Sequence, residues 1–146
     1  MSLLLLFCFV WNCGYSPLYL KKNNLDKAIK IITLKGNPKI NRMIMSFLGL
    51  KESKNVESTY ALLLDSSKKI EVVSKDKNGN PSVYRSSVMI NFLLSDNEKI
   101  IKQKEFNASF TYNNSQNKFN LSQYQKNIEV NLINEISEKI FIFLKS

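Results

Sequence analysis

Hydrophobic and polar residues follow two different periods in the first part of the chain. Residues 27–34 are rich in β-branched side chains that roughly alternate with polar ones, which predicts a strand broken by Gly36. Asn37 and Pro38 then form a favourable start for a helix. Apolar residues recur there at every third or fourth position, which predicts a short amphipathic helix that Gly49 is suited to end. The apolar stripe of this helix consists of Ile40, Met43, Ile44, Phe47 and Leu48.

Residues 56–112 show no helical period and alternate as strands do. Residues 58–64 and 70–75 are either two strands or one long bent strand, with a bulge or turn at residues 65–67. The Asn78-Gly79 pair predicts a hairpin, and residues 95–98 predict the next turn. A last strand is expected over about residues 99–112. The apolar faces of the two strands after the hairpin carry Tyr84, Ser86, Val88, Ile90, Phe92 and Leu94, followed by Phe106, Ala108, Phe110 and Tyr112.

The end of the chain returns to a helical period after a polar loop at residues 113–120. From Leu121 to Leu144, apolar residues lie close to a four-residue row. Residues 140–144 place apolar side chains on more than one helical face, as either a buried helix end or a contact with a large apolar partner. The row consists of Leu121, Tyr124, Ile128, Leu132, Ile136 and Ile140, and it is widened by Val130, Ile133, Phe143 and Leu144.

The order strand, helix, three strands, helix predicts an α+β fold. Both helices can then pack on one face of a four-stranded, mainly antiparallel sheet, which gives a two-layer sandwich with one solvent-facing side. The chain has 146 residues, 44% of them hydrophobic, which is enough for a single core.

The N-terminal residues form an apolar run that is too short for a permanent membrane span. The run extends from Leu3 to Trp11, a length typical of a signal peptide. A cysteine that closes such a run, here Cys13, marks the place where a bacterial lipoprotein precursor is cut and acylated. We therefore expect a lipoprotein signal peptide at residues 1–12, a lipidated tether at residues 13–26, and a single domain at residues 27–146.

Composition removes most catalytic chemistry from consideration. The chain has no His, and its two cysteines, Cys8 and Cys13, lie in the N-terminal segment. Without these residues the body lacks the usual general base and metal ligands. A Ser-Lys arrangement is the catalytic alternative that stays open. We expect no enzymatic activity, no metal and no cofactor apart from covalent lipid on Cys13.

The net charge of +9 permits two interpretations. It reflects either a solvated, lysine-rich exterior or a surface that attracts anionic lipid or nucleic acid. Only Arg42 and Arg85 are arginines, the residue type that nucleic-acid sites prefer. Phe92, Phe106 and Phe110 are expected in the core rather than on a base-stacking surface. We therefore expect no nucleic-acid partner.

The segment Cys13-Gly14-Tyr15-Ser16-Pro17-Leu18-Tyr19, together with the element order, resembles the LptE family of lipopolysaccharide-assembly lipoproteins. The resemblance implies an outer-membrane lipoprotein that faces the periplasm. It also implies a plug within the lumen of the LptD β-barrel, which the protein helps to assemble and to supply with lipopolysaccharide. Gly14 is not the Asp that favours retention in the inner membrane, while Trp11 and Asn12 replace the small residues usual before the acylated cysteine.

The resemblance implies contact with lipopolysaccharide, which carries phosphate groups. Basic side chains near the hairpin are suited to bind these phosphates. The candidate contacts are Lys68, Lys69, Lys75, Lys77 and Arg85. A solvated basic surface is the alternative interpretation of these residues. Two other functions also stay open, namely another periplasmic accessory lipoprotein and a small basic nucleic-acid-binding domain.

Overall fold

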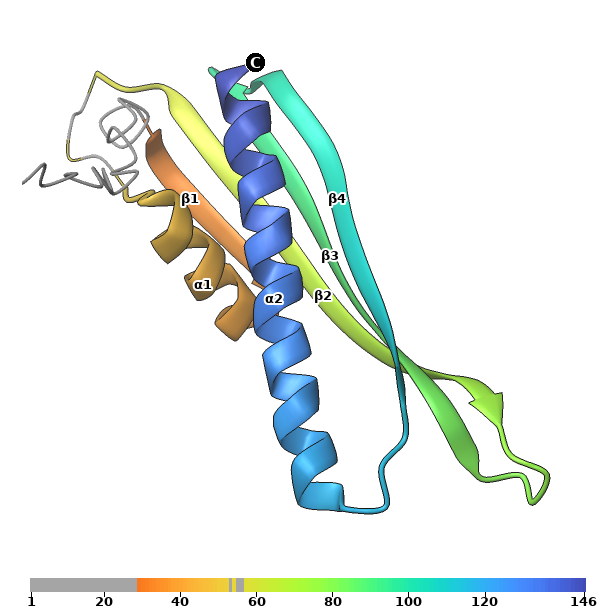
Figure 1. Cartoon of the computed structure of the whole chain (residues 1–146). Coiled ribbons are helices and arrows are strands. Elements are labelled where there is room, and N and C mark those ends of the chain that lie inside the picture. The colour runs from red at the N-terminus through yellow and green to blue at the C-terminus, as the bar shows by residue number, and fades with distance from the viewer. Residues whose placement is uncertain (1–28, 53, 55–56) are drawn as a thin grey trace, which may run out of the picture.

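The computed structural model describes residues 29–52, 54 and 57–146 (Figure 1). The predicted signal peptide at residues 1–12 and the lipidated tether at residues 13–26 lie outside these described residues. The elements follow the predicted order and confirm the α+β class. In chain order they are β1 (Ile29–Gly36), α1 (Pro38–Leu48), β2 (Tyr60–Lys75), β3 (Pro81–Asp96), β4 (Lys99–Asn113) and α2 (Lys118–Lys145).

The four strands form one mixed sheet in the order β1-β2-β3-β4. β2, β3 and β4 pair antiparallel, whereas β1 pairs parallel to β2. Parallel pairing requires a crossover connection, which α1 and the segment after it supply. Both helices cover the same face of the sheet, α1 over β1 and β2 and α2 over β3 and β4 (Figure 1). The predicted two-layer sandwich is therefore confirmed.

The sequence signals for α1 are confirmed at both ends of the helix. The Asn37 side chain accepts hydrogen bonds from the backbone amides of Lys39 and Ile40, and Pro38 takes the first helical position. Gly49 adopts the left-handed conformation, with φ of 66°, and ends the helix.

The turn between β1 and α1 lies directly against β2. The backbone amide of Asn37 donates to the carbonyl oxygen of Ser66 at 3.0 Å, and the Ser66 hydroxyl donates to the Asn37 carbonyl at 3.1 Å. A Cβ atom on Gly36 would lie 1.9 Å from the Ser66 carbonyl oxygen, and Gly36 also has φ of 77°. Only glycine fits both the conformation and the space, so this residue sets how closely α1 approaches the sheet.

Two details of the predicted elements were wrong. β2 is one continuous strand, which was one of the two alternatives expected, but its irregular pairing with β3 lies at residues 72–75 near the hairpin rather than at residues 65–67. α2 begins at Lys118, inside the predicted loop, because the Asn117 side chain accepts hydrogen bonds from Phe119 and Asn120 and caps the helix there.

The core lies between the helices and the sheet and contains most of the predicted apolar residues. Phe110, Tyr124 and Val130 differ from prediction, with exposed fractions of 47%, 46% and 37%. Phe110 is on the edge strand, where α2 covers the face incompletely. The buried stripe of α2 is rotated away from Val130. This stripe comprises Leu121, Ile128, Glu129, Leu132, Ile133, Ile136, Ser137 and Ile140.

The predicted apolar helix end is divided between two environments. Ile140 is fully buried, and Phe143 and Leu144 pack against the core. Ile142 points outward and is 66% exposed. Burial therefore accounts for most of the segment and leaves one side of it available to a partner.

We expect Gly36→Ala to reduce the free energy of unfolding by at least about 2 kcal/mol, because the new Cβ meets the Ser66 carbonyl in a left-handed conformation. Urea-induced unfolding measures this loss. Gly79→Ala is the matched control, because Gly79 has φ of 82° but no atom within 4 Å of an added Cβ. The control should lose only about 1 kcal/mol. Equal losses in the two variants would contradict the role assigned to the close approach.

Candidate functional site

The described residues do not include Cys13, so its acylation stays a prediction. The five basic candidates near the hairpin are all described, and the sheet distributes them over three places. Lys68 pairs with the buried Val88 and lies on the helix-covered face. Lys75 and Lys77 lie at the tip of the β2–β3 hairpin. The structure therefore does not bring these three residues into one site.

Lys69 and Arg85 lie on the opposite, open face of the sheet, where Glu71 is their acidic neighbour. The Lys69 ammonium lies 2.7 Å from the Glu71 carboxylate, and Glu71 is the cross-strand partner of Arg85. The hydrogen bond and charge of Lys69, with a smaller contribution from Arg85, hold the pKa of Glu71 below its usual value. The charge of these two candidates is thus partly balanced within the sheet.

Lys68 belongs to a charged cluster around Glu129, a residue that the sequence analysis did not single out. Glu129 is 5% exposed. Its carboxylate forms ion pairs with the ammonium groups of Lys68 from β2 and of Lys39 from α1, the latter at 2.9 Å. Burial raises the pKa of Glu129, but the hydrogen bonds and charges of the two lysines outweigh burial and hold the pKa below its usual value. The cluster joins both helices to the sheet.

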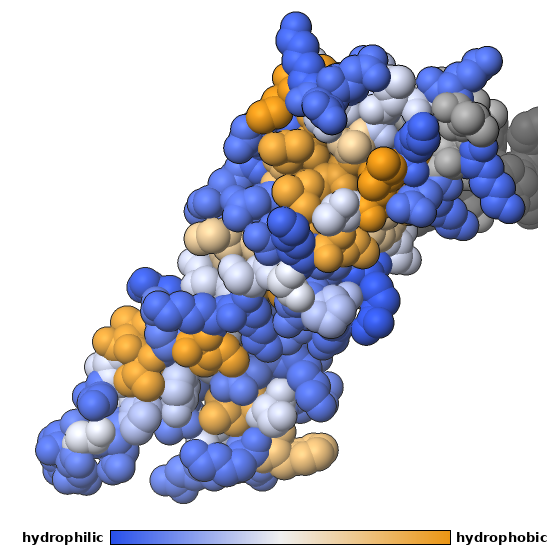
Figure 2. Space-filling view, turned by 180° about the vertical axis from the view of Figure 1, so that it is seen from behind, coloured by the Kyte–Doolittle hydropathy of each residue, from blue (hydrophilic) through white to orange (hydrophobic). Residues whose placement is uncertain are grey.

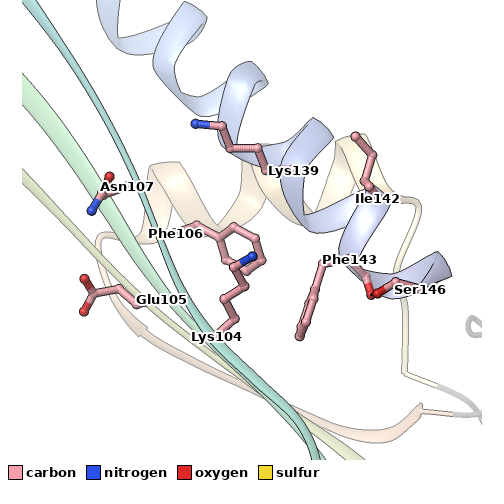
Figure 3. A pocket seen from close by; sticks show the side chains of 8 residues that line it. All are labelled: Lys104, Glu105, Phe106, Asn107, Lys139, Ile142, Phe143 and Ser146. Atoms are coloured by element: carbon pink, nitrogen blue, oxygen red, sulfur yellow. The ribbon is translucent and has the colours of Figure 1, made fainter.

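An open pocket of about 440 Å³ lies between the end of α2 and β4 (Figure 3). The side chains of Phe106 and Phe143 face the space between the two elements, while those of Glu105 and Asn107 point away from it. The rings of Phe106 and Phe143 meet edge to face, with centroids 5.6 Å apart. The exposed Ile142 extends the apolar lining. The interior of this pocket can accept an aliphatic or aromatic group.

Lysines surround the apolar lining of this α2-end pocket. The Lys104 ammonium lies 5.4 Å from the ring centres of both Phe106 and Phe143. Within the described part of the chain, no carboxylate lies within 4.0 Å of it. Lys102 donates to the Phe143 carbonyl at 2.8 Å and so stabilises the helix C-terminus. Lys139, also in the lining, pairs with Glu135 at 2.6 Å. The pocket thus combines an apolar interior with positive charge.

Two features are absent from the described ranges, namely metal-binding clusters and membrane-spanning helices. These ranges contain no group of three or more His, Cys, Asp or Glu residues arranged to hold a metal ion. None of the described helices has the length and apolar character needed to cross a membrane.

We expect Glu129→Gln to reduce the free energy of unfolding by about 1–3 kcal/mol at neutral pH, because two lysines lose their shared carboxylate. Since the pKa of Glu129 is lowered in the folded state, its contribution is present above the usual value of 4.5 and is lost as the pH falls through the lower folded value. Unfolding curves recorded between neutral pH and acid should therefore converge for wild type and variant. Glu135→Gln, which removes a half-exposed partner of Lys139, is the control and should change stability by less than about 0.5 kcal/mol. A Glu129→Gln curve parallel to wild type at every pH would refute the assignment.

No family model matches the chain, and no curated protein matches it in sequence. Solved structures do match its fold. They include the rare lipoprotein B from Shewanella oneidensis, with 12% identity and a TM-score of 0.61 over 80% of this chain and 94% of that one. The minor lipoprotein from Acinetobacter baumannii has 13% identity and a TM-score of 0.59, over 79% and 87%. Lipoprotein B from Nitrosomonas europaea has 11% identity and a TM-score of 0.61, over 84% and 87%. The chain therefore has the fold of these lipoproteins.

Proposed function

We propose that this protein is a lipid-anchored outer-membrane lipoprotein that faces the periplasm and acts as plug and assembly partner of an LptD-type β-barrel in lipopolysaccharide transport. One observation carries the proposal. A chain that begins with a lipoprotein-type segment ending in Cys13 has a body with the fold of solved lipoproteins. The resemblance of residues 13–19 to the LptE family supports the more specific role.

The anchor has a clear physical basis. Acylation of the Cys13 thiol and of the amine freed by cleavage adds several fatty-acyl chains. Each buried methylene contributes about 0.8 kcal/mol, so two or more chains hold a protein firmly where one chain does not. Gly14 is compatible with outer-membrane sorting.

The dimensions of the sheet support the role of a plug. β2 and β3 each have 16 residues, which at about 3.3 Å per residue gives a length of about 50 Å. A bilayer with its headgroups is about 40–45 Å thick. The long hairpin extends beyond the helices (Figure 1), so the molecule is elongated along the strands. A body of this length can occupy a barrel lumen from one membrane surface to the other.

For lipopolysaccharide contact, the α2-end pocket combines the required chemistry better than the dispersed hairpin lysines do. Lipid A presents both phosphate groups and acyl chains. The pocket places the ammonium groups of Lys104 and Lys139 beside the apolar surface of Phe106, Phe143 and Ile142. Among the hairpin candidates, Lys75 and Lys77 are the ones at the exposed tip. We propose the pocket as the stronger contact and the hairpin tip as the weaker one.

We expect Cys13→Ser to abolish acylation and the partitioning of the protein into the outer membrane. After cleavage of the signal peptide, no other cysteine thiol is left for the lipid to attach to. Intact mass and membrane fractionation measure both effects. Cys8→Ser is the matched control, since Cys8 lies in the segment expected to be removed. Affinity isolation from detergent-solubilised outer membrane should recover a large β-barrel of the LptD type. Acyl chains retained on Cys13→Ser would refute the anchor, and a different dominant partner would favour another accessory lipoprotein.

We expect Lys104→Gln/Lys139→Gln to weaken binding of fluorescent lipopolysaccharide about tenfold, because charge-assisted contacts to phosphate contribute about 1.5–3 kcal/mol each at best and surface exposure reduces that value. Lys75→Gln/Lys77→Gln removes the same charge at the other end of the sheet and should weaken binding less. Fluorescence titration at constant ionic strength compares the two pairs. The reverse order of effects would move the contact to the hairpin.

A further inference from the structure

Among the described residues, no element covers the face of the sheet opposite the helices, and this face is apolar at one end. Figure 2 looks onto this face and shows its largest group of hydrophobic side chains in the upper part, with smaller groups lower down. The strand register identifies the largest group, because Ile31, Ala61, Ser95 and Ile100 are cross-strand neighbours, as are Leu63, Leu93 and Gln103. We call this surface the open-face patch, and it consists of Ile31, Ala61, Leu63, Leu93, Ile100 and Ile101.

The open-face patch exposes more apolar side chains than the solvent-facing side of a sheet normally does. Ile31, Ile100 and Ile101 are 52%, 51% and 46% exposed. The pairing of β3 with β4 is irregular between Leu94 and Ser95, and the two successive isoleucines of β4 lie opposite that irregularity. An open face normally alternates polar residues with the buried ones of the other face. A contiguous apolar group on it indicates a contact surface.

The patch lies where the N-terminal segment joins the domain. Ile31 is two residues after Ile29, the first described residue of β1, and the other members come from the beginnings of β2 and β4 and the end of β3. Residues 13–28 separate Cys13 from β1 and can span at most about 55 Å when fully extended. A lipid on Cys13 is therefore connected to the domain at this end of the sheet rather than at the hairpin end.

Lysines flank the apolar residues at this end of the sheet. Lys30 precedes Ile31 and Lys99 precedes Ile100, and both lysines are exposed, with Asp96 and Glu98 as the neighbouring acidic residues. Asp96 is already engaged by the Thr59 hydroxyl. Lysine side chains beside apolar residues can extend their ammonium groups to anionic headgroups while their methylenes stay in the apolar layer.

We propose that the open-face patch lies on the bilayer that holds the lipid anchor, with Ile31, Ile100 and Ile101 at the boundary between anionic headgroups and acyl chains. The contact orients the domain on the membrane before a barrel takes it up. The inference rests on the proposed acylation of Cys13 and adds a second, non-covalent membrane contact to it. It selects a phospholipid surface over a second copy of the chain because the tether enters beside the patch.

A single fluorescent label tests the contact. Acylated chain has no free thiol once Cys8 is removed, so Gln103→Cys gives one labelling site beside the patch. Thr111→Cys is the matched control, because it lies on the same strand and the same face near the hairpin end. Each labelled protein is reconstituted into vesicles of phosphatidylethanolamine and phosphatidylglycerol, with and without nitroxide-bearing lipid. We expect stronger quenching of the label at position 103 than at position 111.

Variants of the patch complete the test. Ile100→Thr/Ile101→Thr should reduce quenching at position 103, whereas Ile70→Thr/Val72→Thr, a pair near the hairpin with exposed fractions of 40% and 42%, should not. Circular dichroism checks that both pairs fold. Equal quenching at positions 103 and 111 in acylated protein overturns the inference alone. A protein whose mass shows no acyl chains overturns the anchor and the inference together. Patch variants that change the oligomeric state instead of the quenching overturn the inference in favour of a second copy.

Discussion

The close approach of the Gly36 backbone to β2 determines how the two layers of this protein fit together. Because no side chain separates Gly36 from the Ser66 carbonyl, the turn after β1 can lie on the sheet and exchange hydrogen bonds with it through Asn37. α1 then begins directly above β2 and packs beside α2 on the same face. The buried carboxylate of Glu129 is possible only in this arrangement, since its two lysines come from α1 and β2.

With both helices on one face, no other part of the chain that the structure describes covers the opposite face of the sheet. The polar residues of the hairpin half suit water, whereas the apolar group at the opposite end does not. The α2-end pocket lies at that same end, next to the start of β4. The surfaces with unusual chemistry are thus gathered near the point where the chain enters the domain. We propose that this is the end that meets the membrane.

Most of the fold could be predicted because its signals are local. Alternation, the Asn37-Pro38 start, the Gly49 end and the Asn78-Gly79 hairpin each depend on a few neighbouring residues. The charged groups were harder to predict. Lys68 and Lys69 are adjacent in sequence, yet they lie on opposite faces, and each meets a different carboxylate. Glu129 is one of many polar residues along α2, and the sequence does not distinguish it from the exposed ones. Its burial becomes visible only when α1 is packed beside α2.

The sequence by itself determined the elements, their order, the α+β class and the candidate acylation site, because periodicity, caps and a single cysteine after an apolar run are readable along the chain. The tertiary structure decided the parallel pairing of β1, the continuous course of β2, the exposure of Phe110 and Val130, the Glu129 cluster and the open-face patch. These features depend on which distant segments meet and on how far each helix covers the sheet. No local pattern carries that information, since the same alternating strand can pair parallel or antiparallel with a neighbouring strand. Its faces can likewise be covered by a helix or open.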